Sequence, residues 1–334
     1  MLTPPHGTPD VVVTGVAAVV PGPGEPSGAW FDADAELGPR GHKYLPPGTR
    51  YLLAAGRRAL RSATTPERVP PERRGLVVGT NNGLAPLFRD MDRTVVGTGA
   101  AALRPALAPY FAVNVLAARL AAEQSFKGFS CTLTTPGVAG AEALQTAVRA
   151  LLLGRADLVT VVAVEDRAVP VREAGTPEEG AVALVLERWA AAERRGAPVR
   201  GAVRAACSFV PPGADGGLRP VVEELLDAVG SGPSAPVHPV LDASDRGRAV
   251  AALLGAPAGR SAARAGCLVP LLAAAEPFTA GGGQRVVVTA TAPGHLAAVH
   301  VRAAGHRGDP LAAGPVTAEP RDTPSGGLRA QPTA

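Results

Sequence analysis

The chain has 334 residues, 46% of them hydrophobic but only 4% aromatic, so its core must be built mainly from Ala, Val and Leu. This length suits one large domain or two fused modules. The formal net charge is +4, but the arginines that supply most of the positive charge are scattered, which argues against a nucleic-acid-binding patch.

The three cysteines are far apart in the sequence, and their spacing fits neither a metal site nor a disulfide framework. The first residues, MLTPPHGTPD, have no apolar signal core. The longest uncharged apolar run, 265–275, is too short to cross a bilayer. We therefore expect a cytoplasmic protein with no metal and no membrane or nucleic-acid partner.

In the first part of the chain, apolar Val-rich runs alternate with patterns of helical period. The predicted strands are 11–20, 75–79, 130–134, 157–165 and 181–187. The predicted helices are 50–62, 84–91, 111–124, 138–153 and 189–195. Residues 21–48 and 94–109 are rich in Gly, Pro or small residues, and we expect loops there.

A second set of elements follows. The predicted strands are 199–209, 237–242, 285–290 and 296–303. The predicted helices are 218–229, 246–254 and 262–275, the last interrupted or kinked at Pro270. Residues 307–334 have few bulky apolar groups, which predicts a disordered tail.

The two sets share an order of elements, which indicates a degenerate internal duplication. The first copy spans 11–189, and the second, shorter copy spans 199–303. Buried strands that alternate with helices predict an α/β fold with mostly parallel sheets covered on both faces.

The stretch 128–144, GFSCTLTTPGVAGAEAL, predicts a strand, a turn and then a helix. Such a turn is a common place for a nucleophile, because the first N–H groups of the helix favour developing negative charge. Here the tip of the turn is Pro136-Gly137, and neither residue can attack a substrate.

Several stretches resemble the thiolase-fold β-ketoacyl synthases. They are 11–24 (VVVTGVAAVVPGPG), 75–83 (GLVVGTNNG), 111–166, 266–278 (GCLVPLLAAAEPF) and 285–301, and the resemblance is firm over 75–187. It implies a thiolase-like α/β fold with two duplicated βαβαβαββ halves in a layered α-β-α-β-α arrangement, the second half shortened.

The sequence departs from this family's pattern where the family has its chemistry. Aligning Gly140-Ala-Glu-Ala143 with the family's Gly-Ala-x-Ala places Gly137 at the position of the nucleophilic Cys. The loop at 242–246 lacks the family's His, and its Gly-His pair is Gly259-Arg260. Ala292 stands at the position of the gating Phe. Losing nucleophile and bases together argues against condensation, and we expect no activity from the chain alone.

A branch of the family that lost the Cys is the chain length factor, or ketosynthase-β, of type II polyketide synthases. The resemblance to it implies a heterodimer, or a dimer of heterodimers, with an active ketosynthase-α. It also implies an acyl chain carried on the phosphopantetheine arm of an acyl carrier protein, with no other cofactor. Many members have Gln at the turn; Gly137 leaves the sub-branch open, a highly reducing system among the options.

The resemblance also assigns site residues. The helix after the glycine turn would supply the wall or floor of the acyl tunnel, against the simpler interpretation that it is core; these residues are Leu84, Leu87, Phe88 and Met91. The strand before Gly137 would pair across the dimer axis through Cys131, Thr132, Leu133 and Thr134. An unpaired strand edge is an aggregation hazard, so we expect an obligate dimer.

Two other functions remain open from the sequence. One is an acyltransferase or hydrolase on the same fold that uses Ser130 or Cys131, although neither has a His nearby in sequence. The other is a homodimeric acyl-binding scaffold.

Overall fold

The computed structural model describes residues 10–305 except 23–24, 26–29, 43, 65, 167–177, 233–234, 257–265 and 281. The strands are β1 (Val11–Val19), β2 (Arg74–Gly79), β3 (Ser130–Leu133), β4 (Leu158–Glu165), β5 (Gly180–Arg188), β6 (Gly201–Phe209), β7 (Val237–Leu241), β8 (Gln284–Ala290) and β9 (His295–Ala303). The α-helices are α1 (Ala33–Leu37), α2 (Pro47–Ser62), α3 (Ala85–Thr98), α4 (Val115–Glu123), α5 (Ala139–Leu152), α6 (Trp189–Arg195), α7 (Leu218–Ala228), α8 (Asp245–Leu253) and α9 (Leu268–Thr279).

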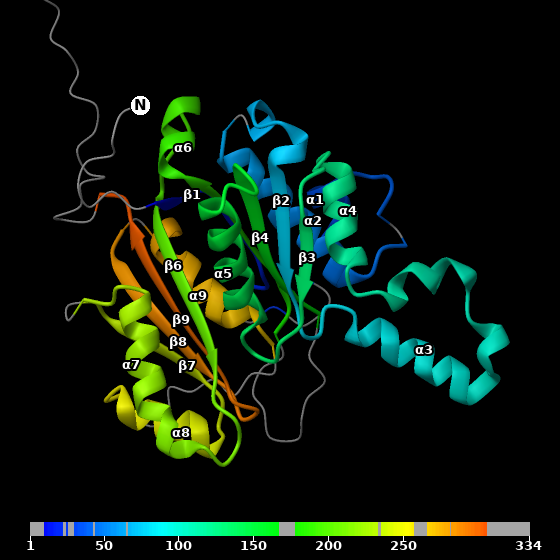
Figure 1. The fold of residues 1–334 in the computed structure, drawn as a ribbon. Coiled ribbons are helices and arrows are strands. Elements are labelled where there is room, and N and C mark those ends of the chain that lie inside the picture. The colour runs from blue at the N-terminus through cyan, green and yellow to red at the C-terminus, as the bar shows by residue number, and fades with distance from the viewer. Residues whose placement is uncertain are drawn as a thin grey trace, which may run out of the picture.

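The described strands form one mixed sheet of nine strands, in the order β3-β2-β4-β5-β1-β6-β9-β8-β7 (Figure 1). Three neighbouring pairs are parallel: β2–β3, β2–β4 and β7–β8. The other five pairs are antiparallel. The prediction of mostly parallel sheets is therefore wrong. Every residue of β4 is buried although β4 pairs antiparallel with β5, so an apolar run reports burial on both faces and not strand direction.

Three hydrophobic cores show how helices cover the sheet. One core joins α2 and α4 to one face of the β3-to-β1 half. A second places α5 and α9 between the two halves of the sheet. A third joins α7 and α8 to the outer face of the β6-to-β7 half. Helices and sheet thus alternate in layers, and α5, which follows the turn at Gly137, lies in the middle layer.

Helix α2 lies very close to β1 at one glycine. A Cβ atom at Gly15 would overlap the carbonyl oxygen of Ala59, so a side chain there would push the helix off the sheet. The register of β1 against β5 shifts between Val13 and Gly15, which marks a bulge at this contact.

Three local expectations are corrected. A short helix, α1, forms within the predicted loop 21–48, because the side chain of Asp32 accepts the first N–H groups of that helix. In the predicted loop 94–109, α3 continues to Thr98 and 3-10 turns follow at Ala100–Ala102 and Pro105–Phe111. Pro270 does not kink α9, because it lies in the first turn, where a missing N–H breaks no helical hydrogen bond.

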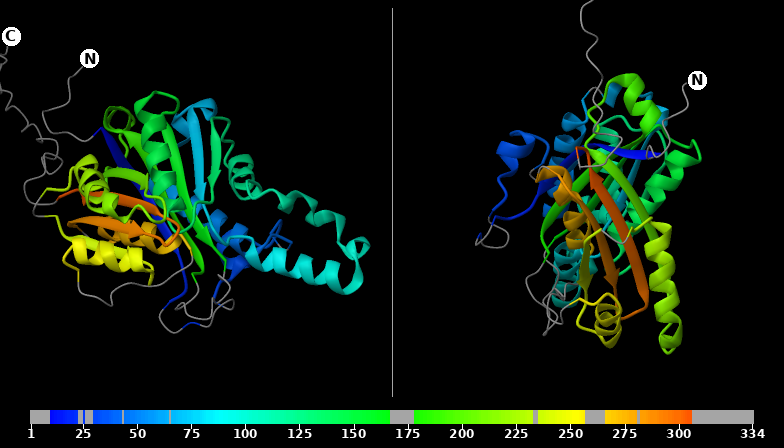
Figure 2. Two further views of the ribbon diagram at one scale, coloured as in Figure 1. Left: turned by 60° about the horizontal axis from the view of Figure 1, so that its bottom comes forward. Right: turned by 90° about the vertical axis from the view of Figure 1, so that its left-hand side faces the viewer.

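Helix α3 and the 3-10 turns that follow it, to Phe111, project from the body as an arm, next to β3 and α4 (Figures 1 and 2). Met91 is the buried residue of α3, whereas Val96 is 81% and Phe111 is 65% exposed. Among the helices of the described ranges, none alone is long and apolar enough to cross a membrane; the bent pair Pro105–Phe111 and Val115–Glu123 passes that test by length and composition only.

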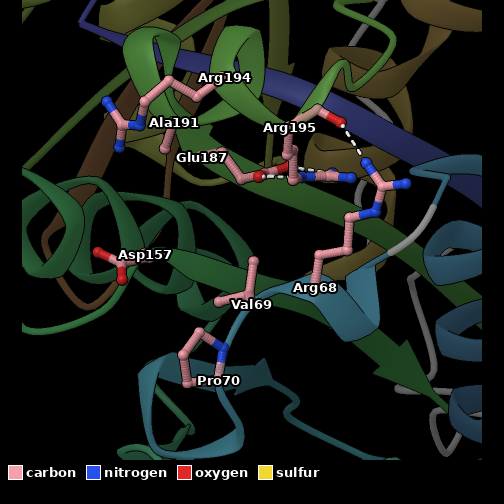
Figure 3. A pocket seen from close by; sticks show the side chains of 8 residues that line it. All are labelled: Arg68, Val69, Pro70, Asp157, Glu187, Ala191, Arg194 and Arg195. Carbon is pink, nitrogen blue, oxygen red and sulfur yellow. Dashed lines mark hydrogen bonds and ion pairs between the residues drawn. The ribbon is translucent and has the colours of Figure 1, made fainter.

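A buried ion pair fastens α6 to the sheet (Figure 3). Glu187, at the end of β5, accepts hydrogen bonds from Arg195 at 2.5 and 2.6 Å and from the Thr14 hydroxyl of β1 at 2.5 Å. Arg195 also donates to the carbonyl oxygen of Ala63 at 2.9 Å, just after α2. Both charged side chains are almost fully covered, with 8% and 0% of their surface exposed.

We predict that Arg195→Met destabilises the fold by about 3–5 kcal/mol, because it leaves the carboxylate of Glu187 buried without its charge partner. Urea unfolding measures this difference. Arg93→Met is the matched control, because the Arg93–Asp90 pair is exposed, and its unfolding midpoint should stay where it is. Equal midpoints for the two variants would show that the buried pair does not hold α6.

Candidate functional site

The turn between β3 and α5 is the centre of the candidate site. Gly137 has φ +70°, the left-handed region that favours glycine. A Cβ atom at position 137 would lie 2.6 Å from the methyl carbon of Thr291, in the loop between β8 and β9. Position 137 therefore carries no side chain, and both its backbone conformation and the neighbouring Thr291 disfavour one there.

Asn81, just after β2, holds the turn in place. Its side-chain NH2 group donates to the carbonyl oxygens of Thr134 at 2.9 Å and Thr135 at 3.2 Å. Its side-chain oxygen accepts the backbone N–H of Gly137 at 3.0 Å. One amide thus fixes the path of the chain on both sides of Pro136.

A buried carboxylate lies behind the turn. Glu165, the last residue of β4, accepts backbone N–H groups from Asn81 at 2.9 Å, Asn82 at 2.6 Å and Cys267 at 2.9 Å. Burial raises the pKa of Glu165, and the hydrogen bonds from Cys267 and Asn81 oppose that shift. The carboxylate joins the end of β2 to the start of α9, which comes from the second half of the chain.

A second glutamate reinforces the start of α9. The side chain of Glu178 accepts the N–H groups of Leu268 at 2.8 Å and Val269 at 3.3 Å, which are first-turn donors of that helix. Burial raises the pKa of the neighbouring Cys267 thiol well above its usual range, and the carboxylates of Glu165 and Glu178 add to the shift. A thiol in that state is a packing group and not a nucleophile.

The loop after β7 has no histidine and holds the β8–β9 loop. Asp242 accepts the backbone N–H of Ala292 at 2.6 Å and that of Ser244 at 3.2 Å. The buried Arg246 donates to the carbonyl oxygens of Val210 at 2.7 Å and Pro211 at 3.1 Å. These side chains order the loops, and this loop offers no imidazole base. The other expected departure, Gly259-Arg260, lies outside the described residues.

The four predicted tunnel residues fall in different environments. Leu84 is buried in the core beneath α2 and α4, and Leu87 packs against that core. Met91 is 5% exposed and Phe88 is 40% exposed, both on the arm. Their role in a tunnel stays a prediction.

The predicted interface strand lies at one end of the sheet. Among the described strands, β3 pairs only with β2. The N–H of Leu76 donates to the carbonyl of Phe129, and that of Thr80 to the carbonyl of Leu133, so the odd-numbered residues face β2. The backbone groups of Ser130 and Thr132 therefore point to the open edge. An open edge can pair with another chain, but the role of residues 131–134 as an interface stays a prediction.

The alternative nucleophiles, Ser130 and Cys131, are not paired with a histidine in the described residues. In the described part of the chain, no hydrogen bond joins Ser130 or Cys131 to a histidine. His300 bonds instead to the carbonyl of Val229 at 3.1 Å, and His295 packs against the ring of Phe209. Burial raises the pKa of Cys207 to about 12. The described residues also contain no group of three or more His, Cys, Asp or Glu side chains that could hold a metal ion.

Two small clefts lie away from the turn. The first, of about 190 Å³, is lined by Arg68, Val69, Pro70, Asp157, Glu187, Ala191, Arg194 and Arg195 (Figure 3). Its carboxylates already have partners: Glu187 pairs with Arg195, and a hydrogen bond from Arg73 lowers the pKa of Asp157. The second, of about 250 Å³, is lined by Asp10, Val11, Val148, Leu152, Val203, Arg204, Ala205 and Ala228. Neither cleft includes a residue of the turn.

The roles of Asn81 and Glu165 are not among the predictions made from the sequence. One signal for Glu165 was available: it ends an eight-residue apolar strand that is buried throughout, and a carboxylate there requires nearby donors. No comparable signal marks Asn81, because its partner Gly137 is 56 residues away in the sequence.

Comparison with known proteins gives the family. The N-terminal domain of β-ketoacyl synthases matches residues 29–204, which is more than half of the chain, and the chain belongs to this family. A curated relative, the chloroplastic 3-oxoacyl-[acyl-carrier-protein] synthase I of Arabidopsis thaliana, is 23% identical over 242 residues. These cover 61% of this chain and 51% of the relative, so the chain spans about half the length of that protein.

Solved structures share the fold. A type II polyketide synthase acyl-carrier protein in complex with its ketosynthase bound to the hexaketide gives a TM-score of 0.70 at 19% identity, over 89% of this chain and 100% of that chain. The ishigamide ketosynthase/chain length factor gives 0.66 at 20% identity, over 88% and 99%. An oxazolomycin ketosynthase domain of Streptomyces albus JA3453 gives 0.60 at 16% identity, over 88% and 95%.

We predict that Glu165→Gln lowers stability by about 1–3 kcal/mol, because an amide cannot accept all three N–H groups. The raised pKa of Glu165 also gives the wild type a distinct pH dependence. A carboxyl group with a higher pKa in the folded state stabilises the fold at low pH, and this contribution is lost as pH rises from the ordinary value of 4.5 through the raised value.

Urea unfolding of the wild type and of Glu165→Gln from pH 4 upward measures both effects. The difference in stability between the two proteins should shrink as pH rises through this window. A difference that grows with pH would mean that the folded pKa of Glu165 is lowered.

Proposed function

We propose that this chain is a non-catalytic, ketosynthase-like subunit, a chain length factor, which pairs with an active ketosynthase in a type II polyketide synthase. The observation that carries the proposal is Gly137. The chain belongs to the β-ketoacyl synthase family. On the alignment of Gly140-Ala-Glu-Ala143 with the family's Gly-Ala-x-Ala, this glycine stands where the nucleophilic Cys is expected, and a Cβ atom there would lie 2.6 Å from the methyl carbon of Thr291. A subunit without a nucleophile can still contribute shape.

The two halves of the sheet support the idea of a duplicated fold. Numbered along the chain, the strands of the first half lie in the order 3-2-4-5-1. The described strands of the second half, β6 to β9, follow the same order, with no counterpart of strand 3 among the described residues. On this proposal, 11–189 and 199–303 are the two thiolase-like halves, the second shortened. The predicted tail, 307–334, lies outside the described residues.

The partner would bind at the open edge of β3 and along the arm. Ser130 and Thr132 direct backbone groups to that edge, and the neighbouring arm exposes Phe88, Val96 and Phe111. Unpaired strand groups next to apolar side chains are the features that a large dimer interface covers. One of the similar structures is described as a ketosynthase/chain length factor, which makes an active ketosynthase the partner to test.

The acyl chain would arrive on the phosphopantetheine arm of an acyl carrier protein. It would be bound covalently by the partner's nucleophile, and only its far end would extend into this subunit. Phe88 is the most exposed of the four proposed tunnel residues, at 40%, and is therefore the one that we place at the surface shared with the partner. A bulky side chain across a tunnel limits the number of carbons that fit. A highly reducing polyketide synthase is one setting for this role.

Co-expression tests the proposal. The chain is produced alone and with ketosynthases that retain the Cys, and each preparation is assayed for size and for condensation of malonyl units. We expect a stable heterodimer that condenses, and no condensation by this chain alone. Condensation by the isolated chain would contradict the proposal. A homodimer that binds none of the co-expressed ketosynthases would also contradict it and would favour an acyl-binding scaffold.

We predict that Phe88→Ala lengthens the product of the heterodimer, because the extra volume lets a longer chain bury CH2 groups at about 0.8 kcal/mol each. Mass spectrometry of the products measures the change. Leu153→Ala is the control, because Leu153 is 70% exposed and lies outside the arm and β3, so it should leave the product unchanged. An unchanged product from Phe88→Ala would remove Phe88 from the tunnel.

We predict that Thr132→Pro prevents heterodimer formation without unfolding the chain. Proline removes an N–H that points to the open edge of β3, and it leaves the bonds between β3 and β2 intact. Thr132→Val keeps the N–H and should pair normally. Sedimentation with the partner measures assembly, and a Thr132→Pro variant that assembles like the wild type would exclude strand pairing at this edge.

A further inference from the structure

The turn 134–137 and the β8–β9 loop 291–294 meet at a place that we call the corner. Two backbone N–H groups border it. One belongs to Gly137 and the other to Ala292. The loops that carry them are in contact, since a Cβ atom at position 137 would lie 2.6 Å from the methyl carbon of Thr291. An acyl-transfer site built on this turn would direct such N–H groups at the developing oxyanion.

Both N–H groups are already bound by side chains of this protein. Gly137 donates to the side-chain oxygen of Asn81 at 3.0 Å. Ala292 donates to a carboxylate oxygen of Asp242 at 2.6 Å. Ala292 is itself exposed, so its N–H would otherwise be open to solvent or to a ligand.

The two acceptors are held in place by their remaining atoms. Asn81 is anchored through its NH2 group to the carbonyls of Thr134 and Thr135. The other oxygen of Asp242 accepts the backbone N–H and the hydroxyl of Ser244. An incoming carbonyl oxygen would have to displace the amide oxygen of Asn81 and a carboxylate oxygen of Asp242. Each of these side chains is also held by its other hydrogen bonds.

We propose that Asn81, Asp242 and Thr291 close this corner in place of a bound acyl group. Two side-chain oxygens occupy the N–H pair, and a methyl group occupies the space next to Gly137. The corner therefore excludes a thioester carbonyl even when a nucleophile is supplied. This inference rests on the proposed function only in taking position 137 as that of the lost nucleophile.

The test supplies the nucleophile and then removes the closing groups one at a time, in the isolated chain. The variants are Gly137→Cys, Gly137→Cys/Thr291→Ala, and the latter with Asp242→Ala. Each is treated with iodoacetamide, which needs no oxyanion stabilisation, and with a small acyl thioester. In the thioester reaction the thiolate introduced by Gly137→Cys forms the new C–S bond to the acyl carbon, and the probe's thiolate leaves and takes up a proton. Peptide mass mapping separates this site from the native cysteines.

We expect Gly137→Cys alone to react with neither probe. Thr291→Ala should permit alkylation, and Asp242→Ala should then raise acylation by at least ~10-fold, with alkylation unchanged, because one oxyanion donor is worth about 10²–10³ in rate. Asp245→Ala, at the start of α8 three residues further on, is the matched control, because the Asp245 side chain is 99% exposed. Acylation of the single Gly137→Cys variant, or equal acylation with Asp242→Ala and Asp245→Ala, would overturn the proposal.

Hydrogen exchange gives a second test that needs no cysteine, and its wild-type measurement does not depend on how any variant folds. In the wild type, the amides of Gly137 and Ala292 should exchange slowly. In Asp242→Ala, protection should fall at Ala292 and stay at Gly137. Rapid exchange of both amides in the wild type would mean that the corner is open. None of these readouts involves a partner subunit, so failure here leaves the pairing tests of the proposed function intact.

Discussion

The carboxylate of Glu165 is the interaction on which the architecture around the turn depends. It is completely buried and binds N–H groups from the end of β2 and from the start of α9, which are far apart in the sequence. Burying a carboxylate costs free energy unless several donors surround it. The residues just after β2 and the residue just before α9 must therefore meet at this carboxylate. Asn81, placed by this contact, then fixes the turn at Gly137. The glycine turn is thus held by a rigid frame although it carries no reactive group.

Much of the fold follows from local sequence pattern. The helix at 189–195 and the strand-turn-helix around Gly137 are found where apolar periodicity and turn residues predict them. Strand direction does not follow, because β4 and β5 have the same buried composition as parallel strands but form an antiparallel pair. The covering of the sheet by helices on both faces does follow, because strands that are apolar along their whole length must be buried on both faces.

The candidate site was only partly predictable. The absence of a side chain at Gly137 is read directly from the sequence. The contacts that close the corner are not, because Asp242 and Ala292 are 50 residues apart and meet only when β7 and β8 pair. The sequence indicates that position 137 has no nucleophilic side chain, whereas the structure adds that a Cβ atom there would lie 2.6 Å from the methyl carbon of Thr291. This distinction matters for function: a corner that is merely empty could be restored by one substitution, but a filled corner favours a subunit that contributes surface and shape.

The central claim is that a ketosynthase fold without a reactive corner acts through an active partner. Its most direct test is intact-mass measurement of both subunits while the reconstituted heterodimer turns over acyl groups from the carrier protein. The account predicts an acyl adduct on the partner subunit alone, with the mass of this chain unchanged throughout. An acyl group covalently bound to any thiol or hydroxyl of this chain during turnover would contradict it.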